Sequence, residues 1–316
     1  MKSPFAIRRD IFLAVVLFAA LAAASLLVGV GDLSAEGTRL FFVSRLPRTL
    51  AAILTGAGLA IAGLVMQTLA RNRFVEPMTA GTGQSAALGI LAAVILAPGA
   101  SVALKSVIAS IAAFFGTALF LLLVRRLPPT QPFLVPLFGI VYGGVVGAIV
   151  TAIAWQTDLL QFVDISTNGE FSAAMAGRYE ILWVVAALVL CAWWIADRLT
   201  VLSLGRDAAT GLGLDYGLML QAGLAIVAVI AGVTVVTVGM IPFVGLVVPA
   251  FVAMRYGDDV RRGLPLVAAG GAALVLASDI AARLIRAPYE VPVGTVLGVV
   301  GAALVLGVLI ARSRHA

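Results

Sequence analysis

Residues 218–238 read LMLQAGLAIVAVIAGVTVVTV and contain no charged side chain. A helix needs roughly 20 apolar residues to cross a bilayer, whereas a strand of a membrane barrel needs only about 10 residues of alternating character. This stretch is long and continuous, so it predicts a membrane-spanning helix. The rest of the chain agrees, because 62% of its 316 residues are hydrophobic and only 11% are charged, against about 25% charged residues in soluble domains.

Similar apolar segments recur along the chain and predict an all-α membrane protein with about ten transmembrane helices. Their expected boundaries are 11–30, 49–68, 79–97, 102–124, 133–154, 181–197, 218–238, 244–255, 265–285 and 293–311. The segment 244–255 is too short to cross alone and contains Pro249, which indicates a broken helix. We expect a single transmembrane domain over residues 1–316, with an insert at about 155–180 that forms a short helix on the outer surface.

The positive charges set the expected orientation. If the N-terminus is inside, 14 of the 21 Lys and Arg residues fall in cytoplasmic segments, in agreement with the positive-inside rule. The first apolar run is longer than the roughly 7–15 residues of a signal-peptide core, so we interpret it as the first span. Both termini are therefore expected in the cytoplasm. The net charge of +6 indicates contact with anionic membrane lipids and not with nucleic acid.

The sequence shows no energy source within the chain. A phosphate-binding P-loop needs Gly-Lys-Ser/Thr, and neither of the two lysines, Lys2 and Lys105, follows a glycine. The single histidine, His315, and the single cysteine, Cys191, exclude a metal site of the Cys/His type. We therefore expect no catalytic residues, no metal ligands and no cofactor bound by this chain, which is not expected to be an enzyme.

One acid lies deep in a predicted span. Asp279 is followed one helical turn later by Arg283, so the two side chains share a helix face. The favoured interpretation is a structural ion pair. The alternative is a stand-alone secondary transporter that uses Asp279 for ion coupling.

Small residues and outer arginines each allow two interpretations. Gly139, Gly143 and Gly147 form a GxxxGxxxG line, which indicates either close helix packing or the smooth wall of a translocation path. At the predicted outer ends of two spans lie the arginines Arg45, Arg48, Arg283 and Arg286. They either extend to the membrane interface or form a basic ring that captures an acidic partner.

A polar segment, Leu204–Tyr216, separates two long apolar segments on the predicted cytoplasmic side. It has small residues at helical spacing, charges at its start and glycines near its end. By itself this composition fits either a plain loop or a docking element. Because the chain has no P-loop and no clear coupling site in the membrane, this segment is the best candidate for receiving energy from a partner.

Several motifs, in this order along nearly the whole chain, resemble the permeases of iron-siderophore and cobalamin ABC importers. They are Arg45-Leu-Pro-Arg48-Thr-Leu, Gly56-Ala-Gly58-Leu-Ala-Ile-Ala-Gly63-Leu-Val-Met-Gln67, Arg71-Asn-Arg-Phe-Val-Glu-Pro77, Phe243-Val-Gly-Leu-Val-Val-Pro249 and Pro292-Val-Gly294. Four segments are similar to the branch for catecholate siderophores, namely 71–77, 169–172 with 177–180, 204–216, and 257–259 with 288–290. One departure is Ala250, where the family usually has His or Asn, so a polar role at this position is in doubt.

The resemblance implies a type II ABC importer permease with short broken helices in the bacterial cytoplasmic membrane. It implies a second permease, either a sister chain or an identical copy, and two cytoplasmic ATPase subunits that bind ATP and Mg²⁺. It also implies a periplasmic or lipid-anchored siderophore-binding protein. Because one His and one Cys cannot carry ferric iron, the metal is expected to cross inside its chelator.

The resemblance also assigns residues to three expected sites. The binding protein docks on Arg45, Arg48 and Arg283. The coupling helices, at about 200–216, contact the ATPases through Leu204, Gly205, Arg206, Asp207, Ala208, Ala209, Gly211 and Gly213, with Ala208, Ala209 and Gly211 as the contact face. The inner gate falls at the loops that contain Asn72, Phe74, Thr130 and Gln131. Gly139, Gly143 and Gly147, which come from the glycine spacing and not from the resemblance, are the candidates for the wall of the translocation path.

The function expected from the sequence is import of a ferric siderophore, with the catecholate type favoured, by alternating access driven by the partner ATPases. A haem or cobalamin importer permease of the same architecture is one alternative. The secondary transporter that uses Asp279 is the other.

Overall fold

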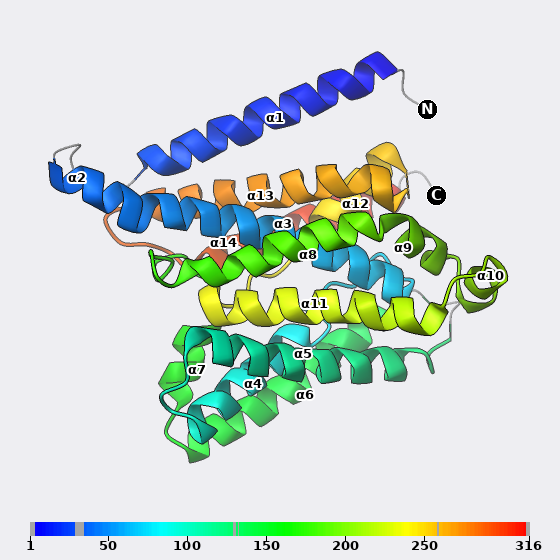
Figure 1. Ribbon diagram of the computed structural model, residues 1–316, viewed down its shortest axis with the longest axis horizontal. Helices are drawn as coiled ribbons and strands as arrows, with labels where there is room; N and C mark the ends of the chain where they lie inside the picture. Colours follow the sequence, from blue (N-terminus) through cyan, green and yellow to red (C-terminus); the bar gives the residue numbers. More distant parts are fainter. Residues whose placement is uncertain (1–3, 29–34, 129–130, 132, 258, 314–316) are drawn as a thin grey trace.

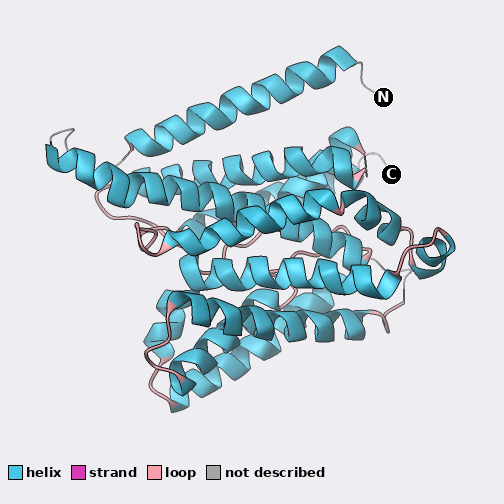
Figure 2. Ribbon diagram, in the orientation of Figure 1, coloured by secondary structure: helices cyan, strands magenta, loops and turns pink. Residues whose placement is uncertain are grey.

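The computed structural model describes residues 4–28, 35–128, 131, 133–257 and 259–313. These residues form helices and no strand apart from one isolated bridge between Asn168 and Met240 (Figure 2). The helices are α1 Pro4–Leu27, α2 Ala35–Leu40, the π-helical η1 Phe41–Arg45, α3 Leu46–Ala70, α4 Thr82–Leu96, α5 Val102–Val124, α6 Leu134–Gln156, α7 Leu160–Thr167, the 3₁₀ turn η2 Tyr179–Leu182, α8 Trp183–Trp194, α9 Ala196–Ser203, α10 Arg206–Gly211, α11 Tyr216–Val238, α12 Val244–Tyr256, α13 Val260–Leu284 and α14 Val293–Ser313.

Each of the ten predicted spans coincides with a helix, although not all are long. Among the described residues, five helices are long and apolar enough to cross a membrane, or six if the bent pair Tyr179–Trp194 and Ala196–Ser203 is one span. Helix α12 is short, as Pro249 and its length predicted. Helix α4 begins only at Thr82, later than expected, because residues 71–81 form an irregular linker. The last two residues of the first predicted span, 29–30, lie outside the described residues.

Helix α3 is the centre of the fold (Figure 1), where it packs against α13, α11, α12 and α8. The approach to α13 is close, since a Cβ on Gly56 would stand 2.4 Å from the Gly271 carbonyl oxygen. The apolar window of the span that contains α3 is 78% buried, whereas that of α6 is 22% buried. Helix α6 therefore lies at the edge, with an apolar face left for lipid or another chain.

The long helices run between two ends of the molecule, which we name after the short helices found there. The α7 end carries α7, α2 and the loop after α13, while the α10 end carries α10 (Figure 1). Helix α1 begins and α14 ends at the α10 end. The start of α1, the end of α14 and α10 therefore lie on the same side of the molecule, and the cytoplasmic location of that side remains a prediction.

Candidate functional site

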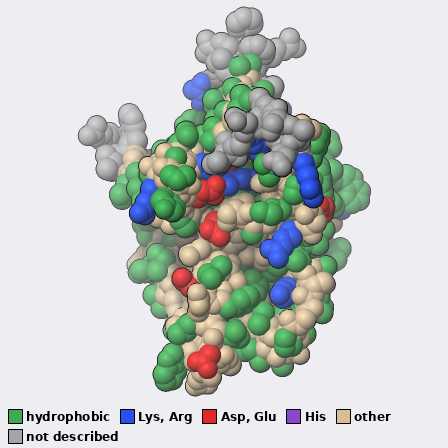
Figure 3. Space-filling model, turned by 90° about the vertical axis from the view of Figure 1, so that its left-hand side faces the viewer, with side chains coloured by type: hydrophobic (Ala, Val, Ile, Leu, Met, Phe, Trp, Pro, Cys, Tyr) green, Lys and Arg blue, Asp and Glu red, His purple; other side chains and the backbone are tan. Residues whose placement is uncertain are grey.

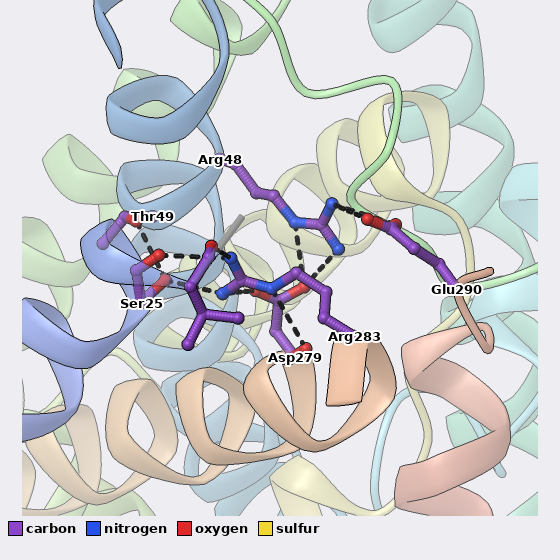
Figure 4. A network of polar contacts seen from close by, with 7 residues as sticks. Ser25, Arg48, Thr49, Asp279, Arg283 and Glu290 are labelled. Atoms are coloured by element: carbon purple, nitrogen blue, oxygen red, sulfur yellow. Dashed lines mark hydrogen bonds and ion pairs between the residues drawn. The ribbon is translucent and has the colours of Figure 1, made fainter. Parts of the chain in front are cut away.

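A network of charged side chains joins three separate parts of the chain at the α7 end (Figure 4). Arg48, near the start of α3, donates from Nε and Nη2 to the Asp279 Oδ1 atom on α13, at 3.1 and 2.8 Å. Its Nη1 donates to both carboxylate oxygens of Glu290, at 2.8 and 2.9 Å. One guanidinium group therefore connects α3 to α13 and to the loop before α14.

Arg283 extends the same network to α1. Its Nη2 lies 2.7 Å from Asp279 Oδ2 and donates to the Ser25 hydroxyl at 3.0 Å. Its Nη1 donates to the backbone carbonyls of Ser25 and Val28. The Ser25 hydroxyl is also 2.9 Å from that of Thr49 on α3. We call the six side chains of Ser25, Arg48, Thr49, Asp279, Arg283 and Glu290 the arginine network.

The charges of the arginine network balance, and most of them are buried. The side chains of Asp279, Arg283 and Arg48 are 0%, 7% and 12% exposed, whereas that of Glu290 is 41% exposed. Buried charges are stable only when paired and hydrogen-bonded. The ion pair between Asp279 and Arg283 that was predicted from the sequence is present. Arg48, which the sequence did not connect to this pair, also binds Asp279 and in addition binds Glu290.

The docking role of Arg45, Arg48 and Arg283 remains a prediction. Arg45 is partly buried at the end of η1, close to Arg48. Within this chain Asp279 already pairs with Arg48 and Arg283, and the two arginine side chains are mostly buried. The surface of this end shows basic and acidic side chains among hydrophobic ones and not a uniformly basic ring (Figure 3).

A second buried carboxylate lies at the break between α11 and α12. Glu76, in the linker 71–81, is 1% exposed and accepts a hydrogen bond from the Phe243 backbone N–H at 2.8 Å. Phe243 has a left-handed backbone with φ +70° and immediately precedes α12. A carboxylate at the start of a helix interacts favourably with the helix dipole. The Gln67 side chain donates to the Gly245 carbonyl at 3.1 Å and holds the same junction from α3.

Sequence reasoning missed this junction. It placed Glu76 in a recognised motif but gave the residue no role, because an acid in a predicted loop is normally solvated. The sequence does contain a signal for it, because Glu76 lies directly before Pro77 in a short linker between two apolar segments. The glycines Gly63 and Gly245, which allow two helices to approach closely, are a second signal. A Cβ on Gly63 would stand 2.0 Å from the Gly245 carbonyl oxygen, so α3 and α12 touch through their backbones.

The linker also contains two of the predicted gate residues. The Asn72 side chain accepts the Phe74 N–H at 2.9 Å, and the Phe74 ring stacks on Phe133, with 5.3 Å between ring centroids. Gln131 is exposed two residues before Phe133. Thr130 lies outside the described residues. The structure thus brings Phe74 and the start of α6 together, and the gate role of these residues remains a prediction.

The glycine line of α6 faces the beginning of α4 and the linker before it. A Cβ on Gly139 would stand 3.2 Å from the Thr79 carbonyl oxygen, and one on Gly143 would stand 3.4 Å from Gly81. Gly147 is less close, with Gln84 at 3.8 Å from its Cβ position. This geometry is close packing within the chain, and a path-lining role for the three glycines stays a prediction.

The coupling segment forms a short exposed helix, α10, at the far end from the arginine network. Ala208 is exposed, and Gly211 and Gly213 have no atom within 4 Å of their Cβ positions. Two apolar side chains that flank α10, Leu204 and Leu212, are also mostly exposed. Among the described helices α10 packs on α9 and α11, and the exposed side chains of its outer surface are available to another protein.

The expected contact face of α10 needs one correction. Ala209 is 0% exposed and packs inside the chain, so it supports the helix from within, while Ala208 and Gly211 face outward. Arg206 and Asp207 are exposed, as expected for a charged rim. Gly205 has φ +100° and is buried against Arg71, whose Cζ atom would stand 3.2 Å from a Cβ at Gly205. The linker that carries Asn72 and Phe74 therefore touches the start of α10.

A cavity of about 340 Å³ opens beside this contact, between α3, α12 and α13. Polar side chains on its wall include Gln67, Asn72, Ser203 and Asp259. No group of three or more His, Cys, Asp or Glu side chains in the described part of the chain is arranged to hold a metal ion.

Comparisons with known proteins agree with a transport role. The model of the FecCD transport family matches residues 9–312. The chain is 37% identical over 308 residues to the petrobactin import system permease protein FatD of Bacillus anthracis, covering 97% of this chain and 92% of that protein. It is 37% identical over 271 residues to the ferric-anguibactin transport system permease protein FatD of Vibrio anguillarum, covering 86% of each.

The fold also matches a solved structure, an inward-facing conformation of a metal-chelate type ABC transporter. The TM-score is 0.80 at 26% sequence identity, covering 96% of this chain and 99% of that one. The likeness therefore extends over the whole helical arrangement.

Proposed function

The chain belongs to the FecCD transport family, and we propose that it is the membrane permease of an ATP-binding-cassette importer for a ferric siderophore. The observation that carries the proposal is the similarity to petrobactin and ferric-anguibactin permeases over most of the chain. We favour a cargo of the catecholate type, such as petrobactin. Because the described residues offer no cluster of metal ligands, the iron crosses inside its chelator.

The proposal includes the partners and the orientation. The α10 end faces the cytoplasm, where two ATPase subunits bind ATP and Mg²⁺ and contact α10. A second permease, identical or a sister chain, completes the translocation path in the inner membrane. A siderophore-binding protein docks at the α7 end, on Arg45, Arg48 and Arg283. The chain acts as one transmembrane domain.

Movement of α10 reaches the gate through direct contacts. When the ATPases close, they displace α10, and its first residues move together with Arg71, which packs on Gly205. Arg71 is the first residue of the linker 71–81, so the displacement reaches Phe74 and its stacking partner Phe133. The role of this chain is therefore to convert a shift at its surface into a change of the gate, by alternating access.

The main rival of a different class is the secondary transporter that uses Asp279. An ion-coupling acid must exchange its ion with water during each cycle. Asp279 is 0% exposed and is held by two guanidinium groups that also hold α1, α3 and the loop before α14. This arrangement favours a structural role for Asp279.

The test is to purify the chain in mild detergent with its bound proteins and to measure uptake in liposomes. We expect ATPase subunits to co-purify, and we expect uptake of a ferric catecholate that requires ATP and the binding protein. Ferric hydroxamate, haem and cobalamin are the comparison substrates, and preferred uptake of haem or cobalamin would identify the related importer. Uptake driven by an ion gradient without ATP would refute the proposal.

A further inference from the structure

A cavity of about 270 Å³ lies at the α7 end, away from the arginine network. It is open to the surface and is lined by Ile90 of α4, by the first turn of α5, by α7, by the end of α11 and by residues between 168 and 178. This volume is far above the roughly 30 Å³ that one water occupies in the liquid. The cavity can therefore hold a group of several non-hydrogen atoms.

Two cations and one carboxylate line this cavity. Lys105 is on α5, Arg178 directly precedes η2, and Glu170 follows the bridge at Asn168. Within the described residues none of the three side chains forms an ion pair or hydrogen bond with another side chain. The contrast with Arg48 and Arg283, whose charges are compensated inside the chain, is clear. The cavity thus offers a ligand two cationic side chains and one separate carboxylate.

An exposed apolar stripe runs from the cavity along α5. It consists of side chains at helical spacing that are each about half or more exposed, namely Leu104, Val107, Ile111, Phe115, Leu119 and Leu122. The stripe begins at Leu104, next in the sequence to Lys105, which lines the cavity. In a membrane such a face contacts acyl chains, while a long cationic side chain at the helix end reaches the headgroup level.

We propose that this cavity binds the headgroup of a phospholipid in the leaflet at the α7 end, with a phosphate and a primary ammonium group. The phosphate contacts Lys105 and Arg178, and the Asn168 amide can donate to it as well. The ammonium group contacts Glu170, which otherwise has no cation. The acyl chains follow the stripe on α5. The proposal depends on the chain lying in a membrane, and not on which cargo it carries.

The lipid has a position from which it can affect transport. Residues 236–239, at the end of α11, line the cavity. The Val238 carbonyl in this segment accepts the backbone N–H of Glu170, and the next residue, Met240, forms the bridge with Asn168. Directly after this segment the helical path is interrupted, and it resumes at the start of α12. A bound headgroup therefore stabilises the arrangement of α7 and residues 168–170 against the α11–α12 break.

The test is native mass spectrometry of the purified complex with an equal mixture of phosphatidylethanolamine, phosphatidylcholine and phosphatidylglycerol. We expect the wild type to retain phosphatidylethanolamine preferentially. The double variant Lys105→Gln/Arg178→Gln should retain it about tenfold less, because charge-assisted hydrogen bonds to the phosphate are lost. The matched control is Arg125→Gln/Arg126→Gln, which removes two cations from the opposite end of α5 and should retain the lipid within about twofold.

Glu170→Gln separates the two parts of the headgroup. It should lower retention of phosphatidylethanolamine and leave that of phosphatidylglycerol unchanged, since the latter lacks an ammonium group. Equal losses in the two double variants, or a lipid preference that is unaffected by Glu170→Gln, would overturn the proposal. Glycerophosphoethanolamine retained as tightly as the whole lipid would assign the cavity to a soluble phosphate compound and would also overturn it.

Discussion

At the α7 end the charged side chains of the arginine network are mostly buried and are compensated within the chain, whereas at the α10 end Arg206 and Asp207 lie exposed on a helix of one or two turns. The first region connects α1, α3, α13 and the loop before α14. Among the described helices the second packs on its sequence neighbours α9 and α11, and Arg71 of the linker 71–81 contacts its first turn at Gly205. The difference teaches that the charges which stabilise the fold are separated from the surface proposed to receive energy from the ATPases. Substitutions of the buried charges at the α7 end should mainly affect stability, and those at α10 should affect coupling.

Asp279→Ala should have the largest effect on stability. It leaves two buried arginines without their shared carboxylate, and breaking such a pair costs about 3–5 kcal/mol. We expect a lower temperature of unfolding in detergent and a lower yield of monodisperse protein. Asp279→Asn keeps a hydrogen-bond acceptor for the two arginines and should therefore lower the free energy of unfolding less than Asp279→Ala does.

The matched control is Asp197→Ala, which removes the partner of Arg261 in an exposed pair. An exposed pair contributes about 0–1 kcal/mol. If Asp279→Asn left the unfolding temperature unchanged but abolished transport, the ion-coupling role of Asp279 would be favoured over the structural one.

Glu76→Ala should have the next largest effect. It leaves the N–H of Phe243 in this partly buried junction without its acceptor, which costs about 1–3 kcal/mol. Glu76→Gln retains an acceptor oxygen and loses only the negative charge at the start of α12. The interaction of such a charge with the helix dipole contributes about 0.3–1 kcal/mol at an exposed helix end and more at a buried one.

Unfolding measured by SDS titration should therefore rank the wild type first, Glu76→Gln second and Glu76→Ala last. The account of the junction is wrong if the two variants are equally stable, because a carboxylate with no function in holding α12 would be replaced equally well by either residue.

Glu290→Gln should have only a small effect on stability, about 0–1 kcal/mol, because this arm of the arginine network is partly exposed. It weakens the interaction of Arg48 Nη1 with residue 290 and removes one negative charge, so the positive charge of Arg48 is more available to an acidic partner. Binding of the purified binding protein should become tighter and more sensitive to salt.

Charge reversal in Arg45→Glu/Arg48→Glu should have the opposite effect on docking. Unchanged docking and transport in this double variant would refute the docking role of the two arginines.

The sequence predicted much of the fold because the long apolar runs leave few alternatives. Segments such as 102–124 and 293–311 correspond closely to α5 and α14. The irregular linker 71–81 was harder to predict, since its start looks like a loop and its end like the beginning of a helix. Its path depends on the contact of Glu76 with residues 167 positions later in the chain, and no local pattern contains that information.

The candidate sites were predicted to different degrees for a similar reason. Composition and spacing identified the exposed segment with α10 and the Asp279–Arg283 pair, which are local features. They did not indicate that Arg48 binds Asp279, since that contact spans 231 positions. They also placed Ala209 on the outer face of α10, whereas packing on α9 and α11 buries it.

The smallest effect on stability and the clearest effect on coupling are expected for Gly211→Trp. Gly211 has open space around its Cβ position, so the free energy of unfolding should change by less than about 0.5 kcal/mol. The control is Gly99→Trp, a glycine with equally open surroundings before α5, at the α7 end. The decisive measurement is the number of siderophore molecules transported per ATP hydrolysed in liposomes that contain the full importer. The account predicts that this ratio falls strongly in Gly211→Trp and stays at the wild-type value in Gly99→Trp. A wild-type ratio in Gly211→Trp, with the ATPases still bound, would contradict the claim that this chain receives its energy through α10.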